Sequence, residues 1–178
     1  PHVDTMLRSS SATRESAGAL GNLLRYLADP SSAKKLARVY RVWRREARDE
    51  PEADKLVARG AEILRKCDRV EDYVYPDGGA DWLESIDLQA TQPALYEEFI
   101  EFRELVRRWQ AAILLPVDQI LLTLGPDLFT EAHELALTHK LALLLRRASE
   151  TNPSWRLPEL TNELAVIARN ERRFLGLS

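Results

Sequence analysis

Apolar residues recur at steps of three or four along almost the whole chain, and this spacing constrains the fold more than any other feature. Such steps place apolar side chains on one face of an α-helix. No segment of useful length alternates apolar and polar residues as a strand would, and no Asn-Gly or Asp-Gly pair joins two such segments. We therefore predict an all-α fold, an irregular multi-helix bundle of seven to eight helices with no sheet.

Prolines and capping residues set the expected helix boundaries. We expect a first helix from near Thr13 to just before Pro30, and a second one that is capped by Ser31 or Ser32. The other expected helices open at Pro51, near Trp82, at Pro93, at Pro116, after Asp127 and at Pro158, and the last one ends near Phe174. We expect Gly125-Pro126-Asp127 to be a helix-breaking turn. The only loop that suggests an internal boundary spans residues 74–80.

The size and composition of the chain fit one globular domain. With 178 residues, 45% of them hydrophobic and 30% charged, the chain is long enough to bury a core. We therefore predict a single helical domain over residues 1–178. No apolar run approaches the roughly 18 residues of a membrane span, so we expect no membrane partner. The single cysteine, Cys67, cannot form an internal disulfide, which fits a cytoplasmic location.

The segment from Lys34 to Arg48, KKLARVYRVWRREAR, concentrates positive charge in an acidic chain. Seven of its residues are Lys or Arg and only Glu46 is acidic, which gives a net charge of +6, whereas the whole chain has a net charge of −3. On one continuous helix, at about 100° and 1.5 Å per residue, five of the cations form a ridge about 21 Å long. These five are Lys34, Arg38, Arg41, Arg45 and Arg48. Lys35 and Arg44 flank the ridge at about 90° on either side.

The ridge has two interpretations from sequence. Like charges four residues apart destabilise a helix, so a ridge of cations favours a partner that carries negative charge, and nucleic-acid phosphates fit best. Alternatively, the ridge is a solvated face, or it pairs with acidic residues of this chain at 48–54 and 97–101. We take all seven cations as candidate DNA-binding residues, with contacts that carry no sequence preference.

The residues of the chain do not form a recognisable catalytic or metal centre. No glycines have the spacing of a phosphate-binding loop or of a dinucleotide-binding fingerprint. His133 and His139 lie on opposite flanks of one predicted helix, with no third ligand at zinc spacing. Among the tryptophans, we expect Trp43 and Trp109 to lie in the core and Trp155 in an exposed loop. We predict no catalytic activity and no cofactor or metal for the chain itself.

Two stretches of the sequence resemble superfamily 1 DNA helicases of the UvrD/PcrA/Rep type. The opening stretch, PHVDTMLRSSSATRESAGALGNLLRYLADP, is similar to a segment in which a proline begins a strand, an arginine-containing turn follows and a leucine-rich helix comes next. The stretch from LPVDQILLTLGPDLF to the end of the chain is similar to a divergent branch of the same family. The residues at compatible spacings in the opening stretch are Pro1, Arg14, Ala19, Leu20, Leu23 and Leu27.

This resemblance implies an excised piece of a larger enzyme. In these helicases the second RecA-like domain is interrupted by a helical insertion, the 2B subdomain. Residues 1–30 would be the transition from the RecA-like domain and residues 31–178 the 2B-like insertion, in agreement with a chain that starts at Pro1 without an initiator methionine. The parent protein would be an ATP-dependent 3′–5′ DNA helicase that uses ATP and Mg²⁺.

The role that the resemblance implies for the chain is regulatory. It would contact duplex DNA, the RecA-like motor domains of the same protein and possible protein partners, without ATPase activity of its own. The family's G-I-G-like duplex contact has no counterpart here, so the basic ridge is assigned to DNA from its charge geometry. The alternative is a freestanding all-α interaction module that docks an acidic protein partner.

Overall fold

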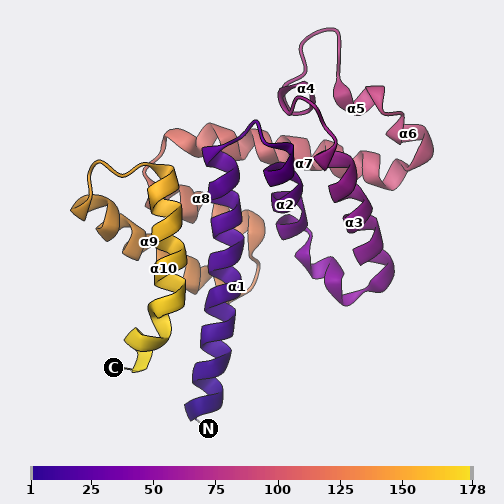
Figure 1. The fold of residues 1–178 in the computed structure, drawn as a ribbon. Coiled ribbons are helices and arrows are strands. Elements are labelled where there is room, and N and C mark those ends of the chain that lie inside the picture. Colours follow the sequence, from indigo (N-terminus) through magenta and orange to yellow (C-terminus); the bar gives the residue numbers. More distant parts are fainter. Residues whose placement is uncertain (1, 177–178) are drawn as a thin grey trace. The chain divides into compact units, whose positions relative to one another are not determined.

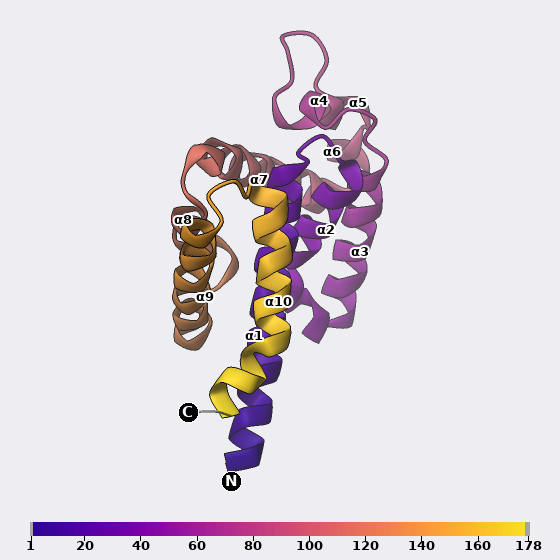
Figure 2. The ribbon, with the colours of Figure 1, turned by 60° about the vertical axis from the view of Figure 1, so that its left-hand side comes forward.

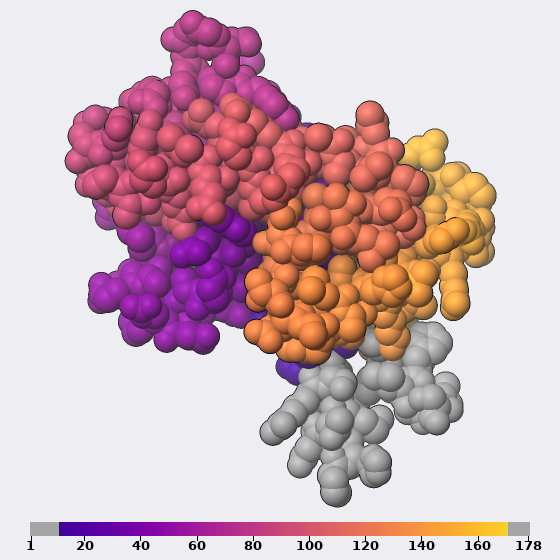
Figure 3. Space-filling view, turned by 180° about the vertical axis from the view of Figure 1, so that it is seen from behind, coloured from indigo at the N-terminus to yellow at the C-terminus, as the bar shows by residue number. Residues whose placement is uncertain are grey.

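The computed structural model of the chain consists of helices joined by turns and loops over the residues it describes. It describes the backbone of residues 2–176, with ten α-helices, two 3₁₀ helices and no strand in that range, which confirms the predicted all-α class (Figure 1). Side chains are described for residues 11–170, the coloured residues of Figure 3. Two single turns of four residues were not predicted, α4 (Glu71–Val74) and α6 (Leu88–Thr91), whereas the short helix expected near Trp82 is α5 (Trp82–Ser85).

The helices form two compact units. The first unit comprises Pro1–Ala28 and Ile113–Ser178, and the second comprises Asp29–Ala112. The predicted division into a transition segment at 1–30 and an insertion at 31–178 remains a prediction.

Four long helices make up the first unit, namely α1 (His2–Ala28), α8 (Val117–Leu128), α9 (Ala132–Thr151) and α10 (Leu157–Gly176). Helices α1 and α10 lie side by side and run antiparallel (Figures 1 and 2). Helix α9 packs against α8, α10 and α1. The core between these helices is aliphatic and includes Leu20, Leu23, Leu24, Leu27, Leu121, Leu124, Leu145 and Leu164, none more than 1% exposed.

Three predicted boundaries in this unit are wrong. Helix α1 begins at His2 rather than near Thr13, so the strand and turn that the resemblance implies are helical from His2 onward. Helix α8 continues through Gly125 and Pro126 to Leu128, so the helix expected to open after Asp127 begins only at Ala132, as α9. Pro126 lies in the last turn of the helix, so only two helical residues follow the point where its ring distorts the backbone.

The second unit is built around α7 (Pro93–Ala111). It also contains α2 (Ala33–Trp43), the 3₁₀ helix η1 (Arg45–Asp49), α3 (Pro51–Arg65), α4 (Glu71–Val74), α5 (Trp82–Ser85) and α6 (Leu88–Thr91). A second 3₁₀ helix, η2 (Ala112–Leu114), follows α7 and spans the boundary between the units.

An aromatic cluster holds α2 and α4 against α7. The Tyr40 ring meets Phe99 and Phe102 edge-on, with centroids 5.5 and 5.3 Å apart, and Trp43 stacks on Phe102 at 5.4 Å. Tyr73 of α4 meets Phe99 at 6.3 Å and donates a hydrogen bond to the Phe99 carbonyl. Trp109 is fully buried, as predicted, whereas Trp43 and Trp155 are both half-buried.

Candidate anion-binding groove

Helix α2 carries the basic segment, but it is shorter than the sequence predicts. The Ser32 hydroxyl caps its first turn by accepting a hydrogen bond from the Lys35 N–H at 3.2 Å. The helix ends at Trp43, and Arg44 leaves helical geometry with φ −103° and ψ 25°. The single ridge of five cations on one helix is therefore wrong, because Arg45 and Arg48 belong to the 3₁₀ helix η1.

Two arginines stabilise the point where α2 ends. The Arg45 guanidinium donates to the Val42 carbonyl at 3.3 Å, and Arg48 Nε donates to the Arg45 carbonyl at 3.1 Å. The last carbonyls of a helix have no intrahelical donor, and a cation near them also interacts favourably with the helix dipole. Arg45 and Arg48 thus help the chain to turn from α2 into α3.

Helices α2 and α3 form an antiparallel pair that small residues bring close together (Figures 1 and 2). Gly60 lies under the Tyr40 ring, and a methyl group at this position would be only 2.8 Å from Tyr40 Oη. Ala37 and Ala61 are buried and Ala58 is half-buried along the same contact. The absence of large side chains between the helices leaves a shallow groove of about 190 Å³.

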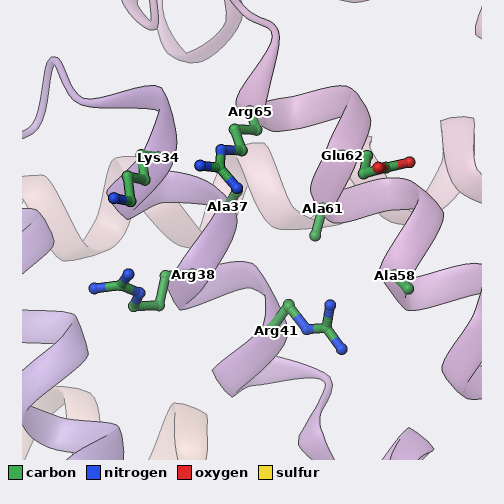
Figure 4. A pocket seen from close by; sticks show the side chains of 8 residues that line it. All are labelled: Lys34, Ala37, Arg38, Arg41, Ala58, Ala61, Glu62 and Arg65. Atoms are coloured by element: carbon green, nitrogen blue, oxygen red, sulfur yellow. The ribbon is translucent and has the colours of Figure 1, made fainter.

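Four cations and one carboxylate line this groove, which gives it a net charge of +3. Lys34, Arg38 and Arg41 come from α2, and Arg65 and Glu62 come from α3. Figure 4 shows Arg65 reaching toward α2 and Arg41 reaching toward α3, whereas Glu62 points away from α2. In this view, Lys34 and Arg38 extend from the side of α2 that is farther from α3.

The four cations of the groove are all exposed, and within residues 11–170 none of them has a carboxylate partner. Other cations of the unit are paired. Arg103, for example, makes two hydrogen bonds of 2.9 and 2.7 Å to Asp81. Unpaired cations on successive helical turns repel one another, and an anion in the groove would relieve that repulsion.

The structure divides the seven predicted residues into three groups. Lys34, Arg38 and Arg41 line the groove. Lys35 pairs with Asp29 at 3.0 Å, and Arg44 pairs with Glu46 at 2.8 Å and with Glu98 at 2.5 Å. Glu98 lies in the acidic stretch 97–101, so the alternative interpretation from sequence holds for Arg44. Arg45 and Arg48 form the third group, at the end of α2.

Arg65 is the groove residue that sequence reasoning missed. It lies in the last turn of α3, about 30 residues after the basic segment begins, in a stretch with no unusual charge. Only the antiparallel pairing of α2 with α3 brings it level with Lys34. The one sequence signal for this pairing is the short connection between the two amphipathic helices, because such a connection favours an antiparallel helix pair.

A buried network fixes α2 beneath the groove. The Tyr40 hydroxyl donates a hydrogen bond of 2.6 Å to Glu98 Oε2, and the same carboxylate pairs with Arg44. Burial, together with the hydrogen bond to Glu98, raises the pKa of Tyr40 well above its ordinary value. Tyr40 therefore stays a neutral donor across the physiological range.

The described residues contain neither a candidate metal centre nor a candidate membrane span. Among them, no three His, Cys, Asp or Glu side chains come together in an arrangement that would hold a metal ion. None of the helices in that range is long and apolar enough to cross a bilayer.

Comparisons of the chain with protein-family models, with curated proteins and with solved structures gave no match. The groove is therefore interpreted from its geometry and charge alone.

Proposed function

We propose that the groove between α2 and α3 binds the phosphate backbone of DNA. The observation that carries this proposal is the set of four exposed cations, Lys34, Arg38, Arg41 and Arg65, that have no carboxylate partner in the described residues. Lys and Arg side chains that neutralise phosphates release condensed counterions, which drives binding without regard to sequence. Contacts of these cations with phosphate oxygens are the same for every base, so we expect no sequence preference.

The wider proposal is that the chain is a 2B-like accessory subdomain of an ATP-dependent 3′–5′ DNA helicase in the cytoplasm. The resemblance of the stretch from Leu115 onward supports it, whereas residues 2–28, where the resemblance implies a strand and a turn before the helix, form one continuous helix. Motor domains of the same protein would bind ATP and Mg²⁺, and the subdomain would regulate unwinding through its contact with DNA.

Equilibrium binding to a labelled DNA duplex at 50 mM salt tests the groove. We expect the double charge reversal R38E/R41E to weaken binding at least tenfold. A control with the same change in net charge is K55E/R69E, since both residues are more than 70% exposed and lie outside the groove. Equal loss of affinity in the two variants would show that only net charge matters and would contradict the proposed groove.

The gene on either side of residues 1–178 tests the helicase assignment. We expect a G-x-x-x-x-G-K-[ST] phosphate loop upstream and a T-x-H-x-x-K-G-L-E-like stretch downstream. A reading frame without these flanking sequences would contradict the helicase assignment and would favour the freestanding module that docks an acidic protein. A polyglutamate peptide that displaces DNA from the groove at equal charge concentration would favour that module as well.

A further inference from the structure

A second cationic groove lies in the first unit, between α1 and α10. It has a volume of about 200 Å³. Three arginines line it, Arg14 and Arg25 from α1 and Arg169 from α10, and no carboxylate does. It shares no residue with the groove between α2 and α3, so the inference below is independent of the proposed DNA contact.

The floor of this groove consists of small residues. Ala17, Gly18 and Gly21 come from α1, and Ala165 and Ala168 come from α10. A methyl group placed on Gly18 would have no atom within 4 Å, so the space above this residue is open. A floor of this kind lets another chain approach the backbones of both helices and gives its apolar side chains a surface to pack against.

The arginines of this groove are spaced far apart along α1. The Cα atoms of Arg14 and Arg25 are eleven residues apart, within about 20° of the same direction and about 16 Å apart along the helix axis. The Arg25 guanidinium extends back over Gly21. The α1 residues between them that line the groove are neutral. All three arginines are exposed, and their one described polar contact is the hydrogen bond of 3.4 Å from Arg25 to Asn22 Oδ1.

The spacing of the arginines along α1 distinguishes this groove from the groove between α2 and α3. A DNA strand carries a charge about every 3.4 Å along its axis, so phosphates would lie over the neutral floor at Ala17 and Gly18, between Arg14 and the Arg25 guanidinium. In the groove of the second unit, by contrast, cations occur on successive turns of α2. A helical peptide can place two carboxylates eleven residues apart, at the same 16 Å spacing, with apolar side chains between them.

From these observations we infer that the groove between α1 and α10 docks an acidic amphipathic helix of a protein partner. Carboxylates of that helix pair with Arg14, Arg25 and Arg169, since guanidinium groups bind carboxylates in bidentate geometry. Its aliphatic side chains pack on the floor over Gly18. This is the helix-in-groove mode of recognition.

A synthetic peptide tests the inference on the full 178-residue chain. The probe is an 18-residue alanine-based helix with glutamates eleven positions apart, two leucines on the same face between them and a fluorescein label. We expect it to bind in a fluorescence anisotropy titration at 50 mM salt, and a version with lysines in place of the glutamates to bind at least tenfold more weakly. Equal binding of the two peptides would overturn the inference.

Two variants separate docking in the groove from attraction to net charge. G18W fills the open space above the floor without changing any charge. R14E/R25E reverses the charge of two of the three arginines that line the groove. We expect each variant to weaken the acidic peptide at least tenfold, while K55E/R69E in the second unit leaves its affinity unchanged. Circular dichroism of G18W checks that the chain is folded.

Unchanged affinity in folded G18W would overturn the docking site. Single-stranded DNA that displaces the peptide, and whose own binding falls in R14E/R25E but not in G18W, would instead assign the three arginines to nucleic acid.

Discussion

The Tyr40 hydroxyl and the Glu98 carboxylate are 58 residues apart in the sequence and meet in a hydrogen bond of 2.6 Å. This bond connects α2 with α7, and Glu98 also pairs with Arg44 at the end of α2. Tyr40 is fully buried and Gly60 of α3 lies against its ring, so the same side chain positions α2 relative to both of its neighbours. The positions of the groove cations on α2 and α3 therefore depend on how Tyr40 packs.

Replacing Tyr40 with Phe should lower the free energy of unfolding by about 1–3 kcal/mol, because Glu98 then loses a donor in a largely buried site. Urea unfolding followed by tryptophan fluorescence measures the effect, since Trp43, Trp82 and Trp109 all lie in the second unit. The control is Y75F, because Tyr75 is 49% exposed. We expect that change to stay within about 0.5 kcal/mol. Equal effects of the two substitutions would show that the bond to Glu98 contributes nothing.

Gly60→Ala should destabilise the second unit by about 1–3 kcal/mol through overpacking. The added methyl group would lie 2.8 Å from Tyr40 Oη and 3.0 Å from Cε2, and the buried, hydrogen-bonded ring has no room to move away. The matched control is Gly18→Ala, also within a helix but with nothing near the new methyl group. We expect that substitution to stabilise the chain by about 0.5–1 kcal/mol. Thermal unfolding measures both, and a stabilised Gly60→Ala variant would contradict the close approach of α2 and α3.

Gly125→Ala should destabilise the packing of α8 on α9, because the new methyl group would lie 2.8 Å from Thr138 Cγ2. Thr138→Ser removes that methyl carbon and can keep the hydrogen bond from Oγ1 to the Glu134 carbonyl. We therefore expect Gly125→Ala to cost about 1–3 kcal/mol in the native background and much less in the Thr138→Ser background. Unfolding free energies of the four chains in this cycle measure the coupling. Simple additivity would show that the two residues do not touch.

Cys67 should react slowly with iodoacetamide in the folded chain. Burial raises the pKa of its thiol from 9.0 to about 11, so between these values the folded state keeps a proton that the unfolded state has lost. The thiolate is the reactive form, so at pH 8 we expect folded chain to react at least about a hundredfold more slowly than chain in urea. By the same linkage, this thiol lowers the free energy of unfolding as the pH rises from about 9 to 11. Similar alkylation rates in the two states would show that Cys67 is not buried.

The sequence was sufficient to predict the helical class and most of the helices. Apolar residues at steps of three or four predicted α7, and the buried residues Phe99, Phe102, Val106 and Trp109 follow that pattern. Proline at the first turn correctly predicted where α3 and α7 begin. These signals are local, so a single sequence carries them.

Features that depend on tertiary contacts were not predictable in the same way. Helix α2 ends without a glycine or proline, at a point that Arg45 and Arg48 stabilise through backbone carbonyls. Helix α9 has leucines on several faces, and two of them, Leu135 and Leu143, are 36% and 45% exposed. Thr138, Leu141 and Leu145 face inward instead.

The candidate site was predictable in part. The charge pattern found Lys34, Arg38 and Arg41, but helical periodicity could not show that Lys35 and Arg44 have carboxylate partners. Arg65 depends on the pairing of two helices, which charge along the sequence does not reveal.

The salt dependence of duplex binding tests most directly whether cations from both helices act together. If Lys34, Arg38, Arg41 and Arg65 each neutralise one phosphate, the logarithm of the binding constant should fall with the logarithm of salt concentration with a slope of about −3.6. In the variant R41Q/R65Q, which removes one cation from each helix, the slope should be about −1.8. A slope that is the same in both proteins would contradict the assignment of this groove to DNA.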